Sequence, residues 1–446
     1  MANTSNSDRG ADDRRITRRR LVQAATAAGI AGLAGCAGGD STSQDTETTQ
    51  TTTASDGGAE TTLTVASWGG DVEQDIVTGI LDDYDSQHPN VAVEYNNTPF
   101  DQYAEKLKTQ FAGNTEPDVF YLIADDAPTF MRNGALLELD PYVKDADDYD
   151  FEPILDNLLD PFQFEGKTFG IPKDFTSVGL FHNTAHLEQA SVDNSMETWD
   201  DLRTALDTVK QQTDVEFPMA FGSQPRNTLV QLIWQNGGRV LNEAGDEAVM
   251  GSQEAIEALE FLVGLKEDGL AGLYGDDLSA TWAAPALGEG NVTATMTGAW
   301  SVSTLEQEYS DQFENLRVAN PTPAGGQEAT IVFTTSWSAS ANTDDPEASA
   351  GLIKDLTSNE GMWEWVETGT ALPSRKPLLE RDFYDERELL GGLADLAEIG
   401  RPLVFGPQTT KILNTLMSEA EGALTGSKSA ADAMQAAERQ INDDVF

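Results

Sequence analysis

The feature that most constrains the fold is an alternation of strand and helix patterns that follows the first sixty residues. Residues 61–68 (TTLTVASW) and 90–100 (NVAVEYNNTPF) are rich in β-branched or alternating apolar side chains, which is typical of strands. Residues 117–124 (PDVFYLIA) are almost continuously apolar, as buried parallel strands are. The two intervals, residues 71–89 and 101–114, have the apolar spacing of helices. The pattern predicts an α/β fold whose parallel sheet carries helices on both faces.

Side chains suited to ligand binding follow these three predicted strands. Trp68 ends the first strand, Pro99 and Phe100 follow the second, and Asp125 and Asp126 follow the third. In α/β sheets, ligands bind beyond the carboxyl ends of the strands, where the loops gather. This edge of the sheet is therefore the predicted ligand edge.

The alternation continues along the rest of the 446 residues. Residues 168–184 are strand-rich, and residues 198–212, 253–269 and 346–369 have amphipathic helical spacing. Thr198 is the predicted N-terminal cap of its helix, and Asn114 lies near the end of the helix over 101–114. A chain of this length can form a large core and two lobes.

The only cysteine, Cys36, ends a short apolar run. This run, from Leu21 to Ala34, is too short to span a bilayer and follows a cluster of arginines, which is the layout of an export signal. The sequence TRRRLV resembles a twin-arginine signal, and LAGC resembles a lipobox. We interpret residues 1–35 as a twin-arginine-type lipoprotein signal and Cys36 as the lipid anchor. The alternative is a plain signal peptide with an incidental cysteine.

Residues 36–60 are predicted to be a disordered linker that holds the folded part off the membrane, because almost no large apolar side chain occurs in them. No cysteine remains for an intramolecular disulfide. No second apolar run approaches membrane-spanning length. We therefore expect contact with the membrane through a lipidated Cys36 only.

The charge balance excludes two classes of partner. The chain has 76 acidic and 27 basic residues, a net charge of −49. Such a surface repels nucleic acid and anionic lipid, so neither is an expected partner. High salt would screen the self-repulsion. Abundant Asp, scarce Lys and a twin-arginine signal together fit a halophilic microbe.

Five segments resemble, in order, parts of one known family, the extracellular solute-binding proteins of ABC importers, in particular the maltose and trehalose type. They are residues 117–143, 164–190, 295–300 (TMTGAW), 338–366 and 371–376 (ALPSRK). The likeness extends over nearly all of the chain from Thr62 to Phe446.

The resemblance implies a two-lobed clamshell of the type II periplasmic-binding-protein kind. Each lobe would be a sheet flanked by helices, and crossing strands would join the lobes around a ligand cleft. Carried over from the family, the N-terminal lobe comprises residues 61–176 and 325–370. The C-terminal lobe comprises residues 177–324 and 371–446.

Four tryptophans lie at the ends of predicted elements or near Gly, where a core residue is less expected: Trp68, Trp234, Trp300 and Trp337. A sugar presents C–H faces that stack on flat aromatic rings, so these are candidate ligand platforms. The resemblance favours Trp300 first and Trp234 next. The alternative for each is a packed core residue. Trp363 and Trp365 lie on a predicted helix and are interpreted as packing residues.

Three carboxylates are candidates for hydrogen bonds to sugar hydroxyls: Asp125, Asp126 and Asp71. The first two follow the third strand, where the resembling family binds sugar, and Asp71 lies close to Trp68. The alternative for any Asp in so acidic a chain is a solvated surface charge.

Two basic residues are candidates because basic residues are scarce. Lys173 (in GIPKD) and Arg375 (in LPSRK) match the family's lobe crossing and its sugar-binding arginine. A guanidinium suits paired hydrogen bonds to adjacent hydroxyls. The alternative for both is a salt bridge with one of the many carboxylates.

An enzyme is the competing class, and its motifs are missing. A glycosidase needs two opposed carboxylates at a set separation, and no motif singles out such a pair. The histidines of HNTAH, His182 and His186, have the i, i+4 spacing of metal ligands on a helix, but they overlie a predicted strand-to-helix turn. No nucleophile elbow or phosphate-binding Gly loop occurs. We expect no catalytic residues, metal or cofactor.

The sequence therefore favours a monomeric, lipid-anchored receptor on the outer face of the membrane. It would capture a sugar and present it to the permease subunits of an ABC transporter. The alternatives are an extracellular carbohydrate-active hydrolase, a structural surface protein, or a receptor for another small solute such as a polyol or glycerol phosphate.

Overall fold

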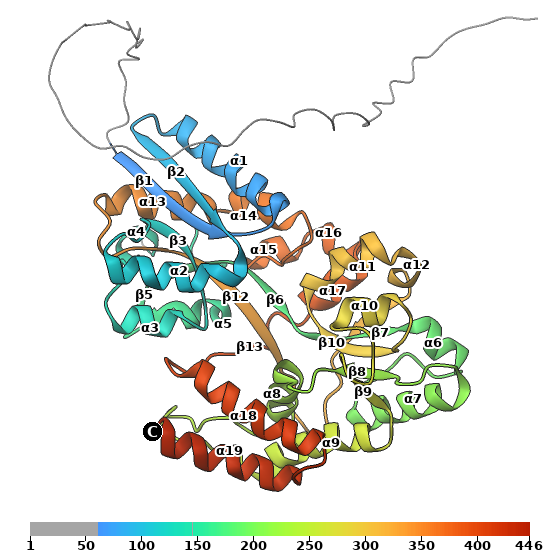
Figure 1. The fold of residues 1–446 in the computed structure, drawn as a ribbon. Helices are drawn as coiled ribbons and strands as arrows, with labels where there is room; N and C mark the ends of the chain where they lie inside the picture. Colours follow the sequence, from blue (N-terminus) through green and yellow to red (C-terminus); the bar gives the residue numbers. More distant parts are fainter. Residues whose placement is uncertain (1–60, 145) are drawn as a thin grey trace, which may run out of the picture. The chain divides into compact units, whose positions relative to one another are not determined.

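The structure is a computed structural model that describes residues 61–144 and 146–446 (Figure 1). The side chains of Asp71 and Val72 are not part of this description. The predicted signal at residues 1–35, the anchor Cys36 and the linker up to residue 60 lie outside it. No helix of the described part is long and apolar enough to cross a membrane.

The first sheet contains the three strands predicted at the start of the folded part. Its strand order is β13-β12-β3-β1-β2, and β6 also pairs with β12. The strands are β1 (Thr61–Trp68), β2 (Val91–Thr98), β3 (Val119–Ile123), β6 (Gly170–Ser177), β12 (Thr330–Ala339) and β13 (Gly400–Pro402). β1 pairs in parallel with both β2 and β3, as predicted. β12 runs antiparallel to β3, so the complete sheet is mixed, although the three strands from which a parallel sheet was predicted are parallel to one another.

The second sheet has the strand order β11-β7-β10-β8-β9. Its strands are β7 (Gly179–Asn183), β8 (Met219–Phe221), β9 (Ala271–Leu273), β10 (Ala294–Thr297) and β11 (Leu316–Ala319). β8 is parallel to β9 and β10, whereas β7 is antiparallel to both of its neighbours. A separate two-stranded pair consists of β4 (Gln163–Phe164) and β5 (Lys167–Thr168).

The antiparallel pair β6–β12 connects the two sheets. β6 pairs with β12 and leads through Val178 directly into β7 of the second sheet, while β12 follows β11 along the chain (Figure 1). Their close approach depends on Gly170, since a Cβ at this position would lie 2.5 Å from the hydroxyls of both Ser336 and Ser338. These are the crossing strands that the family resemblance implies.

Helices occupy most of the intervals between strands. They are α1 (Asp71–Gln87), α2 (Phe100–Gly113), α3 (Ala127–Arg132), α4 (Asp140–Val143), α5 (Asp156–Leu159), η1 (Asp160–Phe162), α6 (Thr184–Gln189), α7 (Trp199–Gln212), α8 (Arg226–Gln235), α9 (Gln253–Glu267), α10 (Ala283–Gly288), η2 (Ala299–Ser301), α11 (Val302–Glu308), α12 (Ser310–Phe313), α13 (Pro346–Leu356), α14 (Asn359–Val366), α15 (Lys376–Leu379), α16 (Asp382–Asp385), α17 (Glu388–Ala394), α18 (Thr409–Leu424) and α19 (Ala430–Asp444).

Two predicted helix ends are confirmed by their local chemistry. Thr198 caps α7, since its hydroxyl accepts the N–H of Asp201 at 3.1 Å while the Asp201 carboxylate accepts the N–H of Thr198 at 3.0 Å. This reciprocal arrangement satisfies N–H groups that have no partner within the helix. Asn114 ends α2 with a left-handed φ of 54°, which Asn tolerates better than most residues.

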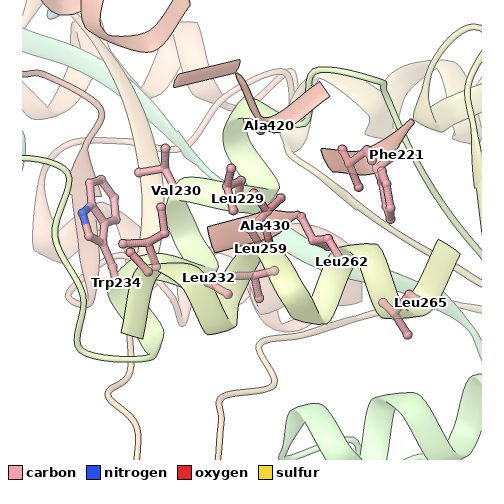
Figure 2. Close-up of a cluster of buried hydrophobic side chains, with 14 of the residues drawn as sticks. Phe221, Leu229, Val230, Leu232, Trp234, Leu259, Leu262, Leu265, Ala420 and Ala430 are labelled. Atoms are coloured by element: carbon pink, nitrogen blue, oxygen red, sulfur yellow. The ribbon is translucent and has the colours of Figure 1, made fainter. Parts of the chain in front are cut away.

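The buried apolar side chains form three clusters. One surrounds the first sheet, and a second lies between the second sheet and helices α8, α9, α18 and α19. Figure 2 shows part of the second cluster, with Leu229, Val230 and Leu232 from α8, Leu259, Leu262 and Leu265 from the neighbouring α9, and Trp234 at one end. The third cluster includes Phe175 of β6 next to residues of α10, α11 and α17. The crossing strand β6 is thus held in the core.

Candidate functional site

A cavity of about 460 Å³ lies along the crossing strands β6 and β12. We call it the crossing-strand pocket. Its lining includes Trp68, Glu73, Phe100, Asp125, Lys173, Asp174, Phe175, Thr176, Arg226, Trp300, Phe333, Thr334, Thr335, Trp365 and Thr370. Its volume is within the range of about 300–1,000 Å³ that is common for small-molecule sites. Because β1 and β3 end here, the pocket lies at the predicted ligand edge of the first sheet.

Aromatic side chains form one wall of the pocket at the end of β1. The Trp68 ring contacts Phe100, Tyr103 and Tyr121 edge to face, with ring centroids 5.5, 4.9 and 4.9 Å apart. Tyr103 and Tyr121 are buried and hold Trp68 in place, whereas Phe100 is 68% exposed. An apolar ring left in water at the mouth of a pocket is typical of a ligand-binding surface.

Trp300 lies at the pocket on the short turn η2 and is 40% exposed. Its ring is 5.9 Å from that of Phe333 on β12. The two residues before it determine its position. The N–H of Ala299 donates to the Thr176 hydroxyl at 2.9 Å, and Gly298, which has no side chain, leaves room for the ring. A Cβ on Gly298 would lie 2.5 Å from the Trp300 ring and 2.9 Å from the carbonyl oxygen of Ser177. The TGAW sequence therefore allows this tryptophan to fold back against β6.

A β-bulge in β6 places Lys173 in the pocket. Thr335 of β12 pairs with Asp174 and the next residue, Ser336, pairs with Pro172, so Lys173 is the extra residue between them. A bulge redirects side chains and accommodates a proline, which cannot donate to the ladder. As a result Lys173 and Asp174, which a regular strand would point to opposite faces, are joined by an ion pair.

This ion pair is buried and is bonded to the tryptophan of α14. The Nε1 of Trp365 donates to Asp174 Oδ2 at 2.7 Å. The Lys173 ammonium lies 3.7 Å from the centroid of the Trp365 ring and 4.5 Å from that of Tyr121. Burial lowers the pKa of Lys173, although the charges of Asp174 and Glu73 oppose this. Burial likewise raises the pKa of Glu73. Lys173, Asp174 and Trp365 thus form a rigid polar surface in the pocket that can donate and accept hydrogen bonds.

Asp125 faces the pocket from the loop after β3. Burial raises the pKa of Asp125 from 3.8 to about 6. The positive charge of Arg226 opposes this shift, and the negative charge of the neighbouring Asp126 adds to it. Arg226 begins α8 and lies with its guanidinium carbon 5.9 Å from the centre of the Phe333 ring. The pocket is thus lined by a carboxylate that follows a strand of the first sheet and by a guanidinium that follows a strand of the second.

The raised pKa of Asp125 predicts a pH-dependent cost to stability. Below about pH 4 its carboxyl is protonated in both folded and unfolded chains, whereas between about pH 4 and pH 6 the unfolded chain ionises first. The contribution of Asp125 to the free energy of unfolding therefore falls as the pH rises through this window. Above pH 6, Asp125→Asn should have a free energy of unfolding about 1 kcal/mol higher than that of wild type. The expected difference is no larger because solvent reaches part of the side chain and reduces the effect. Denaturant titrations from pH 3.5 to 8 at constant salt measure this difference.

The control is the same variant at low pH. Near pH 3.5, where the Asp125 carboxyl is protonated in both the folded and the unfolded chain, Asp125→Asn and wild type should differ least in stability. An Asp125→Asn difference that is constant with pH would contradict a raised pKa.

The structure brings four of the predicted site residues together and leaves the others elsewhere. Trp68, Asp125, Lys173 and Trp300 line the crossing-strand pocket, whereas Asp126, Trp234, Trp337 and Arg375 do not. Asp71 is the first residue of α1, two positions before Glu73, which lines the pocket. The structure does not describe the Asp71 side chain.

Trp337 and Arg375 are buried, which conflicts with their predicted contact with a ligand. Trp337 is 2% exposed and packs on Tyr121, with ring centroids 4.2 Å apart. Arg375 is 1% exposed, and it donates to the carbonyl oxygens of Thr357 and Asp150 at 2.6 Å each. Its guanidinium carbon lies 4.9 Å from the centre of the Tyr149 ring. Arg375 therefore joins segments of the core.

Trp234 lies in the second cluster and is 7% exposed (Figure 2). It lines a different cavity, considered below. Its position after an apolar helical run indicated packing as much as ligand binding, and the tertiary structure favours packing.

Sequence reasoning missed several pocket residues. Arg226 carried a signal, because the scarcity of basic residues that singled out Lys173 applies equally to it. Asp174 is next to Lys173, but only the bulge brings the two side chains together. Phe333 lies in the middle of a strand pattern. Trp365 was interpreted as packing only; it is indeed buried, and it also lines the pocket.

His182 and His186, whose i, i+4 spacing was set aside as a metal site, lie on β7 and α6, on either side of the predicted strand-to-helix turn. His182 contacts Asn194 at 2.9 Å and His186 contacts Thr293 at 3.1 Å. Among the residues that the structure describes, no group of three His, Cys, Asp or Glu side chains could hold a metal ion.

Known proteins resemble this chain in sequence and in fold. A family model described as "Bacterial extracellular solute-binding protein" matches residues 79–390. A binding protein of Brucella abortus is 21% identical over 313 residues, which is 68% of this chain and 73% of that protein. The lactose-binding protein of Rhizobium radiobacter is 24% identical over 255 residues, 55% of this chain and 58% of that protein.

Among solved structures, the sugar-binding protein MalE from Xanthomonas citri matches with a TM-score of 0.78 at 20% identity, over 86% of this chain and 96% of that one. This likeness confirms the predicted two-lobed α/β fold. The lobe boundaries taken from the resemblance stay a prediction.

Proposed function

The chain belongs to the bacterial extracellular solute-binding protein family, and from that premise we propose that it captures a sugar outside the cell and delivers it to the permease of an ABC importer. Family membership implies an exported protein whose task is binding. The sugar is supported by the lactose-binding relative and by the fold shared with MalE. We propose accordingly that the chain has no catalytic activity of its own.

The observation that carries the proposal is the combination of aromatic rings and fixed polar groups in the crossing-strand pocket. Trp68, Phe100 and Trp300 offer ring faces or edges to a ligand, and Phe100 and Trp300 are substantially exposed. A pyranose has C–H faces that pack on such rings and hydroxyls that need directed partners. The Lys173–Asp174 pair and Asp125 supply these partners from a rigid framework.

Anchoring is proposed from sequence alone. In this view Cys36 carries the lipid, residues 37–60 link it to the folded part, and the receptor works as a monomer beside its permease. Fractionation of cells that express Cys36→Ser tests the anchor: the proposal requires the variant to leave the membrane fraction, and a variant that stays bound would refute it.

A thermal-shift screen over mono-, di- and oligosaccharides tests the ligand class. The screen should be run in molar salt, because the charge of −49 is then screened. A sugar present at 100 times its Kd should stabilise the protein by about 2.7 kcal/mol. The shift must shrink in Trp300→Ala, which assigns it to this pocket: a tenfold weaker affinity would lower the stabilisation at that sugar concentration to about 1.4 kcal/mol.

Two results would contradict the proposal. One is that no sugar raises the melting temperature while a polyol does so in a Trp300-dependent way. The other is release of smaller sugars from an oligosaccharide during incubation, which would favour the hydrolase.

A further inference from the structure

A second cavity, of about 750 Å³, shares no lining residue with the crossing-strand pocket. Its walls come from the end of α3, the end of α8 and the loop after it, β13 and the loop that follows, and residues 445 and 446. Three arginines line it: Arg132, Arg239 and Arg401. We call it the arginine pocket.

The charge of this lining is opposite to that of the chain. Acidic residues outnumber basic ones by 76 to 27 in the whole sequence. The arginine pocket nevertheless contains three arginines and no Asp or Glu side chain among its lining residues. The three arginines come from segments that are far apart in the sequence. The cluster therefore results from the fold and is not a local run of basic residues.

These positive charges are poorly neutralised. Arg239 is ion-paired with Glu243 at 2.9 Å, but the side chains are 56% and 83% exposed, so the pair is weak. Within residues 61–144 and 146–446, no ion pair is found for Arg132 or Arg401. Arg401 has only a long contact of 3.4 Å to the Gln327 side chain and a ring contact, 5.8 Å to the centre of Trp234.

Arg401 also carries a sign of mutual repulsion. Burial lowers the pKa of Arg401, and the positive charge of Arg239 lowers it further. Like charges held together in a partly buried cavity raise the energy of the fold unless an anion joins them. The 16-residue helix α18 begins at this pocket after Gln408, and the positive end of its dipole favours an anion as well.

We propose that the arginine pocket binds a phosphate-type oxyanion, as inorganic phosphate or as a phosphate ester. Guanidinium groups match tetrahedral oxyanions through paired N–H donors. The cavity is larger than a bare anion requires, and Val404, Phe405 and Pro407 form an apolar wall for the organic part of an ester. This site is independent of the crossing-strand pocket and of the sugar proposed there.

Isothermal titration calorimetry of the full chain with inorganic phosphate and with phenyl phosphate tests the site. Ionic strength is matched with sodium chloride, because screening alone weakens such contacts. We expect saturable binding at one site. Arg239→Gln and Arg401→Gln should each weaken it at least tenfold. Glu243→Gln should strengthen it, since it removes the carboxylate that competes for Arg239.

The matched control is Arg203→Gln, which removes the same charge from an exposed residue paired with Asp268. It should change the affinity less than twofold. Tighter binding of phenyl phosphate would identify an ester site and equal binding an inorganic one, and both support the proposal. Absence of binding for both probes would overturn it, as would an equal loss in Arg203→Gln. Arg239 is exposed, so its variant should fold even if Arg401→Gln does not.

Discussion

Arg375→Ala is expected to lower the free energy of unfolding by about 2–4 kcal/mol while leaving sugar affinity per folded molecule unchanged. The side chain is 1% exposed and bonds the carbonyl oxygens of Thr357 and Asp150. Alanine would leave both acceptors unpaired and open a cavity beside Tyr149. Removing a buried cation recovers some desolvation energy, which is why the expected loss is not larger. Denaturant unfolding followed by fluorescence measures the change.

Arg203→Ala is the control for this variant, because it also removes a guanidinium but from the surface. Its cost should stay below about 1 kcal/mol. If Arg375→Ala instead unfolds like wild type and loses its sugar affinity, the role that the family resemblance implies for Arg375 is right and its burial is relieved when the ligand binds.

Trp300→Ala is expected to weaken sugar binding by about tenfold to a few hundredfold, equivalent to roughly 1–3 kcal/mol. The ring is 40% exposed at the pocket and meets the Phe333 ring in an edge-to-face arrangement, so its removal should cost the unliganded fold little. Titration calorimetry with the sugar identified by the thermal-shift screen gives the affinity. Melting of the unliganded variant should be nearly that of wild type.

Trp282→Ala is the matched control, since Trp282 is 37% exposed and does not line the crossing-strand pocket. It should bind sugar as wild type does. Equal losses in the two variants would show that the effect is not specific to the pocket. A Trp300→Ala chain that unfolds, yet binds normally in its folded fraction, would show that Trp300 is a core residue.

The sequence was sufficient for the fold and for one edge of the site. Strand and helix patterns are local, so β1, β2 and β3 could be predicted from periodicity. Because parallel strands end on the same side, Trp68 and Asp125 could be predicted to lie near each other before any contact was known. The family resemblance added the crossing strands, with Lys173 on one of them, and it favoured Trp300 among the candidate tryptophans.

Periodicity could not predict which distant segments meet. The Trp365–Asp174 hydrogen bond joins residues 191 positions apart, and a bulge in β6 turns Lys173 and Asp174 toward each other. Neither feature leaves a mark in the local pattern. β12 pairs with β3 in the antiparallel direction and makes the sheet mixed. This pairing also joins segments that are far apart in the sequence, so periodicity could not predict it.

Burial separates what the sequence by itself determined from what only the tertiary structure decided. Residue type, local position and, for Arg375, the family resemblance identified Trp234, Trp337 and Arg375 as able to bind a ligand. The alternatives were a packed core position for the two tryptophans and a salt bridge for Arg375. Trp337 is enclosed by Tyr121, and Arg375 is bonded by two loop carbonyls, because the segments around them fold over these side chains. The arginine pocket arises in the same way, since three isolated arginines acquire a common function only when α3, the α8 loop and β13 come together. The chemical group of a side chain follows from its residue type. Its exposure and its neighbours depend on long-range contacts, which no local pattern contains.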